Sequence, residues 1–302
     1  MAIALNTGKV YAGFREPLDL SSDILDATAL FNAYKARVQA DGGIIPNAAG
    51  CKERFEFLVN NGMYENAVMC AAPAFGVKLG GTDGNDVLTV YSLLGESTDL
   101  IPAAQGTGDA VRYDSTNKTA TVRITSSGGT YLRTRENVRV QIGRSYMIAG
   151  RLSDASNADV LGMTIGISLS NLPLAYMRTM ITNHQAITEA WRFGTRDSAW
   201  TGPVAGGAVG AAATTYADYV PAAGLFKVDE GVVYGYTRGK LDKTATATTG
   251  KLADLVNFTV PIVVGGGMAS GTVSPCYGSL LDMLFLHTAS EPDAVLASRF
   301  GM

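Results

Sequence analysis

The spacing of apolar residues changes near Gly80-Gly81, and this change constrains the fold more than any other feature of the chain. Upstream, apolar side chains recur every three or four residues, at Ile24, Ala27, Phe31, Tyr34 and Val38. That spacing is typical of one face of an amphipathic helix. Downstream, from about residue 84, the period becomes two, which is typical of half-buried β-strands. The sequence therefore predicts a small helical region followed by a larger β-domain.

Short helices are expected in residues 1–82. Ser21-Ser22 is a favourable cap for the first helix, and Gly42-Gly43 is a favourable end. A second helix is expected from about Asn47 to Asn60-Asn61-Gly62, with one face formed by Cys51, Phe55, Leu58 and Gly62. A third, shorter helix is expected from Glu65 to Ala72, because Pro73 would end it.

Residues 83–302 are interpreted as an antiparallel two-sheet β-sandwich. Strand-like alternation occurs in segments 87–94, 120–125, 138–142, 162–169 and 258–264. Clusters of Gly, Asn, Asp and Ser separate them, and glycine contributes 35 of the 302 residues, as a fold with many turns requires. The Gly/Ala-rich segment 202–224 has little periodicity and is interpreted as a long surface loop. A last helix is expected from Glu291 to Phe300.

Charge and hydropathy exclude several classes of partner. The net charge of −3 gives a field that would not attract nucleic acid. No apolar run approaches the roughly 20 residues of a membrane helix; the densest, Leu280 to Leu286, contains Asp282. The start of the chain lacks the charged and long apolar parts of a signal peptide. We therefore expect no nucleic-acid partner, no membrane insertion, and folding in a cytoplasm.

No catalytic residue, cofactor or metal ion is expected. The three cysteines, Cys51, Cys70 and Cys276, form no Cys-x-x-Cys pair and are interpreted as buried, reduced thiols. His184 and His287 are interpreted as hydrogen-bonded histidines in or near strands. The segment Asp83-Gly-Asn-Asp86 is interpreted as a hydrophilic turn, with a calcium loop as the alternative. Carboxylates are scattered along the chain, whereas glycosidic cleavage requires two that face each other.

Charge is segregated along the chain. Residues 1–111 carry a net charge of −6, residues 112–151 of +6 and residues 152–302 of −3. The positive block contains the arginines Arg112, Arg123, Arg133, Arg135, Arg139, Arg144 and Arg151. One interpretation is a solvated sheet face; the other is a face that meets acidic residues of the same or another subunit. We expect Arg133, Arg135 and Arg139 to face such an acidic surface.

Several segments resemble concanavalin A-like (laminin-G-like) jelly rolls. Val232–Leu241 resembles a hairpin of these domains, Pro261–Gly265 an apolar strand followed by glycine, Tyr277–His287 the final strand, and Ser290–Leu296 the closing helix. The segment Ala29–Gly80, with its Ala/Gly-rich exit, is similar to a module that precedes such domains in virion proteins of tailed bacteriophages.

The resemblance implies a non-enzymatic structural protein of a phage virion, assembled in the host cytoplasm. Residues 1–82 would dock and oligomerise, and residues 83–302 would form an outward-displayed jelly roll of a tail fibre, baseplate or collar. Implied partners are a homotrimer, other virion proteins and a host surface glycan. The stripe of Ile24, Phe31, Tyr34 and Val38 is the expected subunit contact, with packing on the chain's own sandwich as the alternative. A capsid decoration (cement) protein and a glycan-degrading enzyme are alternative functions.

Overall fold

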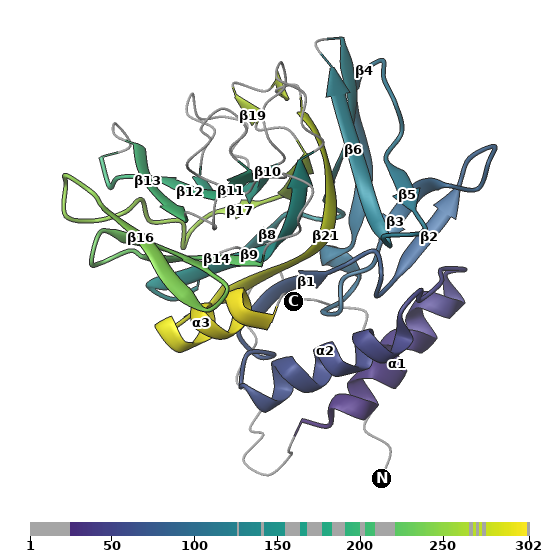
Figure 1. The fold of residues 1–302 in the computed structure, drawn as a ribbon, viewed down its shortest axis with the longest axis horizontal. Coiled ribbons are helices and arrows are strands. Elements are labelled where there is room, and N and C mark those ends of the chain that lie inside the picture. Colours follow the sequence, from purple (N-terminus) through teal and green to yellow (C-terminus); the bar gives the residue numbers. More distant parts are fainter. Residues whose placement is uncertain are drawn as a thin grey trace.

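A computed structural model describes residues 25–125, 127–139, 142–154, 164–167, 177–182, 191–199, 203–208, 221–265, 268–269, 272–273 and 276–300. Within these residues the protein is mainly β, a sandwich of antiparallel strands with three α-helices on one side (Figure 1). The predicted class is confirmed at this level. None of the described helices combines the length and apolar character that crossing a bilayer requires.

The three α-helices begin at capping side chains. Helix α1 (Ala27–Ala40) begins at Asp26, whose carboxylate accepts hydrogen bonds from the backbone of Thr28 and Ala29, and α2 (Ala48–Asn60) begins at Asn47. Helix α3 (Glu291–Phe300) follows Ser290, as the sequence predicts. All three helices are confirmed, although the first begins at an aspartate rather than at the expected serine pair.

The strands are antiparallel wherever two described strands pair. Their bounds are β1 Ala67–Ala71, β2 Val77–Gly80, β3 Asp86–Val90, β4 Leu100–Gly106, β5 Arg112–Asp114, β6 Thr119–Thr125, β7 Gly128–Thr134, β8 Val138–Arg139, β9 Ser145–Asp154, β10 Thr164–Ile167, β11 Met177–Thr182, β12 Trp191–Arg196, β13 Pro203–Ala208, β14 Ala222–Lys227, β15 Val232–Thr237, β16 Lys240–Thr246, β17 Thr259–Val260, β18 Ile262–Gly265, β19 Met268–Ala269, β20 Thr272–Val273 and β21 Cys276–His287. A short 3₁₀ helix, η1, spans Glu96–Thr98.

Two runs of neighbouring strands form the layers of the sandwich. One run is β16, β15, β14, β9, β21 and β1. The other passes from β2 through β3, β4, β7, β18, β10, β11 and β12 to β13. Strand β6 pairs with both β7 and β21 and so joins the two runs.

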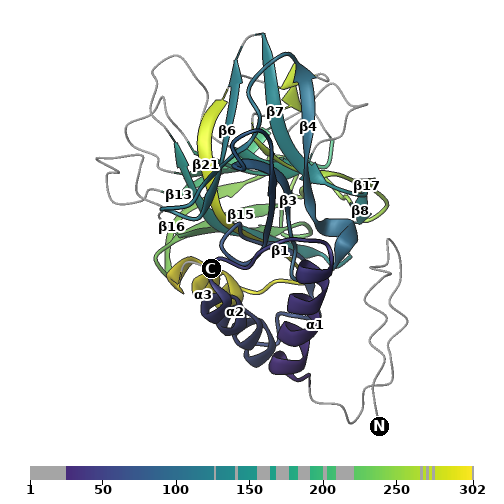
Figure 2. The ribbon, with the colours of Figure 1, turned by 90° about the vertical axis from the view of Figure 1, so that its right-hand side faces the viewer.

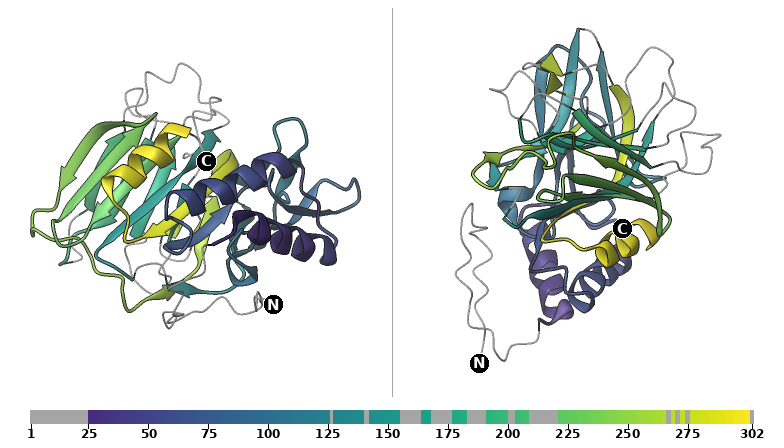
Figure 3. Two further views of the ribbon diagram at one scale, coloured as in Figure 1. Left: turned by 90° about the horizontal axis from the view of Figure 1, so that it is seen from below. Right: turned by 90° about the vertical axis from the view of Figure 1, so that its left-hand side faces the viewer.

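The first run of strands is covered on both faces. On β9, Tyr146 and Ile148 belong to the core between the layers, whereas Met147 and Ala149 belong to a second core against the helices. Figures 1 and 2 show all three helices on this side of the sandwich, and the view from below shows them lying across the sheet (Figure 3). The N-terminal helices and α3 therefore share one layer.

The helix predicted from Glu65 to Ala72 is wrong. Residues 67–71 form strand β1 instead, which pairs with β21. Val68, Met69, Cys70 and Ala71 are all buried, and a short apolar run that is buried on both faces has no period that separates a strand from a helix. Strands β1 and β2 precede residue 82 but pair with β21 and β3, so the sheet extends across the predicted division of the chain.

The long loop predicted for 202–224 is also wrong where the structure describes it. Residues 203–208 form β13, and β14 begins at Ala222; residues 209–220 lie outside the described ranges. Strand β14 is almost wholly buried, and Gly224 leaves space for the ring of Phe193, since a Cβ atom there would collide with it. Small residues thus form a buried strand here rather than a turn.

Candidate functional site

A cleft of about 510 Å³ lies between helix α2 and strand β21, and we call it the α2–β21 cleft. Its polar lining comes from four parts of the chain: α2, the β5–β6 turn, β9 and β21. The side chains used below are Asn47, Glu53, Arg54, Asn117, Lys118, Arg151 and Asp282. The volume lies within the range of about 300–1,000 Å³ that is usual for small-molecule sites.

One side of α2 lines this cleft. Gly50, Arg54 and Phe57 follow one another at spacings of four and three, which places them on one side of the helix. Cys51, Phe55 and Leu58 lie on the buried face, as the sequence predicts.

A β-bulge on β21 turns Asp282 toward this side of the sheet. Leu280 pairs with Leu152 and Asp282 with the next residue of β9, Arg151, so that Leu281 is an inserted residue. Before the bulge Leu280 contributes to the inter-layer core; after it Met283 does so, whereas Asp282 lines the cleft. Side chains alternate between the two faces of a strand, so one inserted residue moves every later side chain to the opposite face.

Asp282 lies between two arginines. Its Oδ2 accepts from Arg151 Nε at 2.8 Å and lies 4.0 Å from Arg54 Nη2. Asp282 is 1% exposed and Arg54 7% exposed. Burial raises the pKa of Asp282, while Arg151 and Arg54 act to lower it. The Arg54 guanidinium also lies over the rings of Phe75 and Phe57, at 5.3 and 5.9 Å from their centroids.

Two buried atoms of this cluster have no hydrogen-bond partner among the described residues. They are Arg54 Nη1 and Asp282 Oδ1. An unsatisfied buried polar group costs about 1–3 kcal/mol, and most such groups in native proteins find a partner. Both side chains line the cleft, but the two unpaired atoms are themselves buried, so a ligand there reaches them only if the side chains turn toward it.

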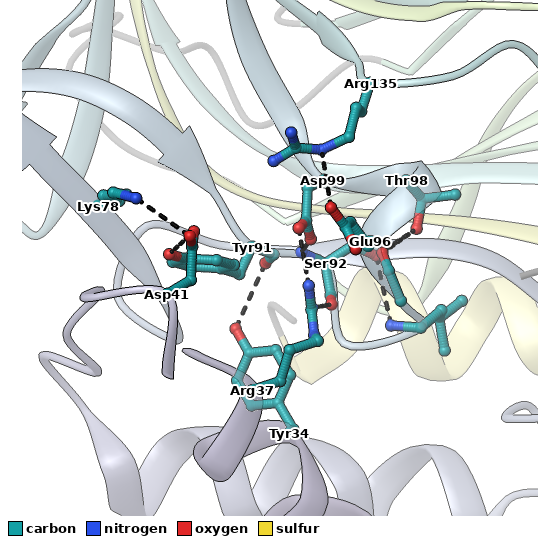
Figure 4. Close-up of polar contacts among 12 residues, drawn as sticks. Tyr34, Arg37, Asp41, Lys78, Tyr91, Ser92, Glu96, Thr98, Asp99 and Arg135 are labelled. Carbon is teal, nitrogen blue, oxygen red and sulfur yellow. Dashed lines mark hydrogen bonds and ion pairs between the residues drawn. The ribbon is translucent and has the colours of Figure 1, made fainter. Parts of the chain in front are cut away.

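A second polar cluster joins α1 to the sandwich, and we call it the α1 cluster: Tyr34, Arg37, Ser92 and Asp99 (Figure 4). Arg37 Nη1 donates to Asp99 Oδ2 at 2.7 Å, and Arg37 Nη2 donates to the Ser92 carbonyl at 2.5 Å. The Ser92 backbone N–H donates to Asp99 Oδ1 at 2.7 Å. The hydroxyl of Tyr34 donates to the Phe75 carbonyl at 3.2 Å. Among the described residues, none of these four side chains has a buried polar atom without a hydrogen-bond partner, unlike Arg54 and Asp282 in the cleft.

The apolar stripe predicted as a subunit contact packs largely within the chain. Tyr34 and Val38 are 4% and 0% exposed in the core against the helices, and the half-buried ring of Phe31 lies 6.3 Å from that of Phe55. Ile24 lies outside the described residues. The contacts are those of the alternative interpretation, in which the stripe packs on the chain's own sandwich.

The three arginines predicted to face an acidic surface lie on or beside β7 and β8, away from the α2–β21 cleft. Arg133 is half-buried, and its Nε donates to the Thr134 carbonyl at 3.3 Å. Arg135 is exposed and forms an ion pair with Glu96 at 3.9 Å. Arg139 is half-buried opposite Thr259.

Other arginines of the positive block form pairs within the chain. Arg112 contacts Asp83 and Asp86, and Arg123 contacts Asp109, so that acidic residues of segment 1–111 meet basic residues of segment 112–151. Arg151 is the member that lies at the cleft. The two aspartates of the alternative calcium loop are thus paired with Arg112. Within the described ranges no three His, Cys, Asp or Glu side chains gather as metal ligands.

The structure tests the environments that the sequence predicts for the cysteines and for His287. All three cysteines are buried and none of them forms a disulfide, as expected. His287 is buried on β21, and its Nδ1 accepts a hydrogen bond from the backbone of Ile142 at 3.1 Å, which confirms a hydrogen-bonded strand histidine. His184 lies outside the described residues.

Sequence reasoning missed the residues that form the cleft. Arg54 lies among Cys51, Phe55 and Leu58 at helical spacing, so a charge within an apolar face was the available signal. For Asp282 the signal was a carboxylate within the densest apolar run of the chain. Nothing in the sequence places these two residues together.

Comparisons with known proteins find relatives in structure only. No family model matches the chain, and no curated protein matches it. A solved structure of botulinum neurotoxin type C, described as depending on interaction with two ganglioside molecules to enter cells, matches with a TM-score of 0.50 and 10% identity. The match covers 78% of this chain and 51% of that one, so this chain spans about half the length of its first structural neighbours.

Two further solved structures are less similar. The binding domain of Paraclostridial Mosquitocidal Protein 1 matches with a TM-score of 0.46 and 10% identity, over 77% of this chain and 52% of that one. A CBM40 of the Ruminococcus gnavus IT-sialidase, bound to α2,6 sialyllactose, matches with a TM-score of 0.37 and 16% identity, over 52% and 84%. At these identities the first match shows a shared β-rich fold and nothing more, and the two weaker matches add no argument.

Proposed function

We propose that this protein is a glycan-binding, adhesion-type protein without catalytic activity, and that the α2–β21 cleft binds the sugar. The observation that carries the proposal is the buried pair Arg54 and Asp282: two charged side chains that line one cleft and that hold an unused donor and an unused acceptor. Neighbouring hydroxyls of a sugar ring supply both partners, since each hydroxyl accepts and donates. Asn47, Asn117 and Arg151 add further polar groups around the same volume.

The fold likeness supports the choice of a sugar as ligand. The matched neurotoxin structure is described through its interaction with gangliosides, which are glycolipids. A β-sandwich with a small polar cleft is a suitable scaffold for the same kind of ligand, although a scaffold does not determine a function. The proposal therefore depends on the cleft, and the shared fold is secondary support.

The arrangement of carboxylates favours binding over glycan cleavage. Glycosidases place two carboxyl groups on opposite sides of the scissile bond. The cleft contains two carboxylates, Asp282 and Glu53, but Asp282 is engaged by Arg151 and lies 4.0 Å from Arg54 rather than being held free as an acid or a nucleophile. Outside it, Asp229 is paired with Arg144 at 2.6 Å, and Glu230 contacts Lys227 at 3.4 Å. Release of reducing ends by the wild-type protein would favour the enzyme alternative.

A glycan array tests the binding function. We expect the wild-type protein to bind a subset of glycans and Arg54→Met to lose most of that signal. Arg123→Met is the matched control, because Arg123 also lies over an aromatic ring, that of Tyr277 at 5.8 Å, and also contacts an aspartate, but is exposed. Thermal melting shows whether each variant is folded. An array without any wild-type signal, or a folded Arg54→Met protein with unchanged signal, would contradict the proposal.

We further propose that the sandwich is a concanavalin A-like jelly roll displayed on a tailed-phage appendage, where it attaches the virion to the host. The support is the resemblance of Val232–Leu241 and Tyr277–His287 to strands of such domains; these segments form the hairpin β15–β16 and the long strand β21. The other arrangement, a capsid decoration protein, would give head-bound rather than tail-bound label in images of intact particles.

The proposed trimer is tested by its mass in solution. One subunit has a mass of 31.6 kDa, so light scattering should give about three times this value. Because Tyr34 and Val38 are buried within the chain, the contact between subunits would have to use other residues, including the exposed side of α1. A mass of one subunit at micromolar concentration would exclude the trimer.

A further inference from the structure

We propose that the sugar bound in the α2–β21 cleft is acidic, with a carboxylate that faces Arg54, Arg151 and Lys118. The inference rests on the proposed glycan-binding function and names the class of its ligand. The cleft is lined by these three cationic side chains and by two carboxylates, Asp282 and Glu53. A local excess of positive charge in a chain of net charge −3 is a specific feature of this surface.

The buried part of the cleft is cationic for a structural reason. Asp282 is shared between Arg54 and Arg151, so one carboxylate faces two guanidinium groups. The three cationic side chains of the cleft outnumber its two carboxylates by one, and Arg54 Nη1 has no hydrogen-bond partner among the described residues. The planar fork of an arginine matches a carboxylate, which accepts two parallel hydrogen bonds. A carboxylate would supply both the missing charge and the missing acceptor.

The N-terminus of α2 adds to this field. Asn47 and Gly50 both line the cleft, and the first turn of the helix contains no acidic residue. The Asn47 side chain accepts a hydrogen bond from the Gly50 N–H, but no negative charge within that turn compensates the positive end of the helix dipole. This end alone would not define a site, but here it lies beside a buried arginine with an unused donor.

Lys118 occupies a backbone conformation that favours glycine. Its φ is +56°, in the turn between β5 and β6, where the Asp114 carboxylate accepts hydrogen bonds from the backbone of Thr116 and Asn117. A side chain at such a position usually costs stability, and strained residues of this kind often lie at functional sites. Lys118 is one of the residues that line the cleft.

This strain provides a variant that removes the charge without harming the fold. Lys118→Gly removes the amine and relieves the positive φ, so the variant should be at least as stable as the wild type. Arg238→Gly is its matched control, because Arg238 is also cationic, also has a positive φ of +48°, and lies in the exposed turn between β15 and β16. Any difference between the two variants in binding reports on the cleft.

Calorimetric titration with paired ligands tests the inference. The probes are trigalacturonic acid and sialyllactose, each beside its carboxyl-reduced form, and sulfated lactose as a different anion. We expect the carboxylate forms to bind at least about ten-fold more tightly than the reduced forms. Lys118→Gly should weaken only the carboxylate forms by several-fold, Arg238→Gly should change neither, and added salt should weaken the carboxylate forms most.

Each other outcome has one meaning. Equal affinity for the acid and reduced forms would overturn the inference and leave glycan binding intact. Tighter binding of sulfated lactose than of either carboxylate would assign the site to a different anion. Unchanged binding in both Lys118→Gly and a folded Arg54→Met protein would move the site away from the cleft. Glycan-array binding without affinity for any of these probes would leave the proposed function standing and overturn the acidic ligand, whereas an empty array would overturn both.

Discussion

Two arginine–aspartate contacts with buried aspartates join the N-terminal helices to the sandwich, and they differ in how completely the aspartate is hydrogen-bonded. Arg37 on α1 contacts Asp99, and Arg54 on α2 approaches Asp282; both aspartates are 1% exposed. Both guanidinium groups also lie over two aromatic rings, Arg37 at 5.4 Å from each of Tyr34 and Tyr91. In the α1 cluster both carboxylate oxygens accept hydrogen bonds, whereas in the cleft Asp282 Oδ1 accepts none within the described structure.

The difference separates a structural contact from one available to a ligand. Burial raises the pKa of both aspartates and arginine acts against it in both, so their electrostatic settings are similar. A fully satisfied polar cluster stabilises one arrangement of the chain, whereas a partly satisfied one carries a cost that a bound molecule can remove. Unpaired buried atoms on side chains that line a cleft, rather than burial or charge alone, thus distinguish Arg54 and Asp282 from the α1 cluster.

The largest expected effect comes from changing each aspartate to asparagine. Asp99→Asn places an amide donor against either Arg37 or the Ser92 N–H, and disrupting a buried pair of this kind costs about 3–5 kcal/mol. Asp282→Asn also removes the carboxylate that faces Arg54 and Arg151, but it can place its amide at the unpartnered Oδ1 position and keep the acceptor that faces Arg151, so it loses charge without losing a hydrogen bond and a smaller loss is expected. Urea unfolding of both variants measures the two values. Equal losses would show that the two clusters do not differ in this way.

His287 extends the comparison to a buried group whose pKa is shifted by burial. Burial lowers its pKa to about 4, from the usual value of 6.5. Between these two pH values the unfolded chain binds a proton that the folded chain does not. Stability is therefore complete above pH 6.5 and falls as the pH drops toward 4, by about 3 kcal/mol in total. The wild type should show this loss in unfolding experiments across the range.

The control for the histidine is His287→Gln, which keeps an acceptor for the Ile142 N–H but has no proton to gain. The difference between wild type and variant isolates His287 from the aspartates that titrate in the same acid range. Parallel stability curves for the two proteins between pH 6.5 and 4 would show that the histidine is not buried as described.

The sequence predicts those elements whose own residues carry a strong pattern. Helices α1 and α3, strand β6, the hairpin β15–β16 and the long strand β21 all agree with the expected elements. The prediction fails for strand β1 and for the Gly/Ala-rich strands β13 and β14. In these strands, burial on both faces or small side chains remove the alternation of apolar and polar residues. Periodicity reports which faces are buried, and it fails where both are.

The cleft could not be predicted for a different reason. The bulge is at Leu281, between Leu280 and Asp282. Nothing in the residue types around it distinguishes a bulged strand from a regular one. Without the bulge, Asp282 would face the inter-layer core rather than Arg54. The site thus depends on register between β21 and β9, a long-range property that the local sequence does not encode.

The smallest effect on unfolding stability is expected for the exposed arginines of the positive block, whose ion pairs are surrounded by water. Arg123 and Asp109 are 59% and 60% exposed and 3.4 Å apart. Exposed pairs of this kind contribute about 0–1 kcal/mol, because water screens the attraction and ordering the side chains costs entropy. Arg123→Gln should therefore lower unfolding stability by less than about 1 kcal/mol, and 0.5 M salt should remove even that difference. A larger loss that persists in high salt would show that arginines of residues 112–151 hold the sandwich together. Solvent exposure would then not distinguish their contribution to stability from that of Arg37 and Arg54.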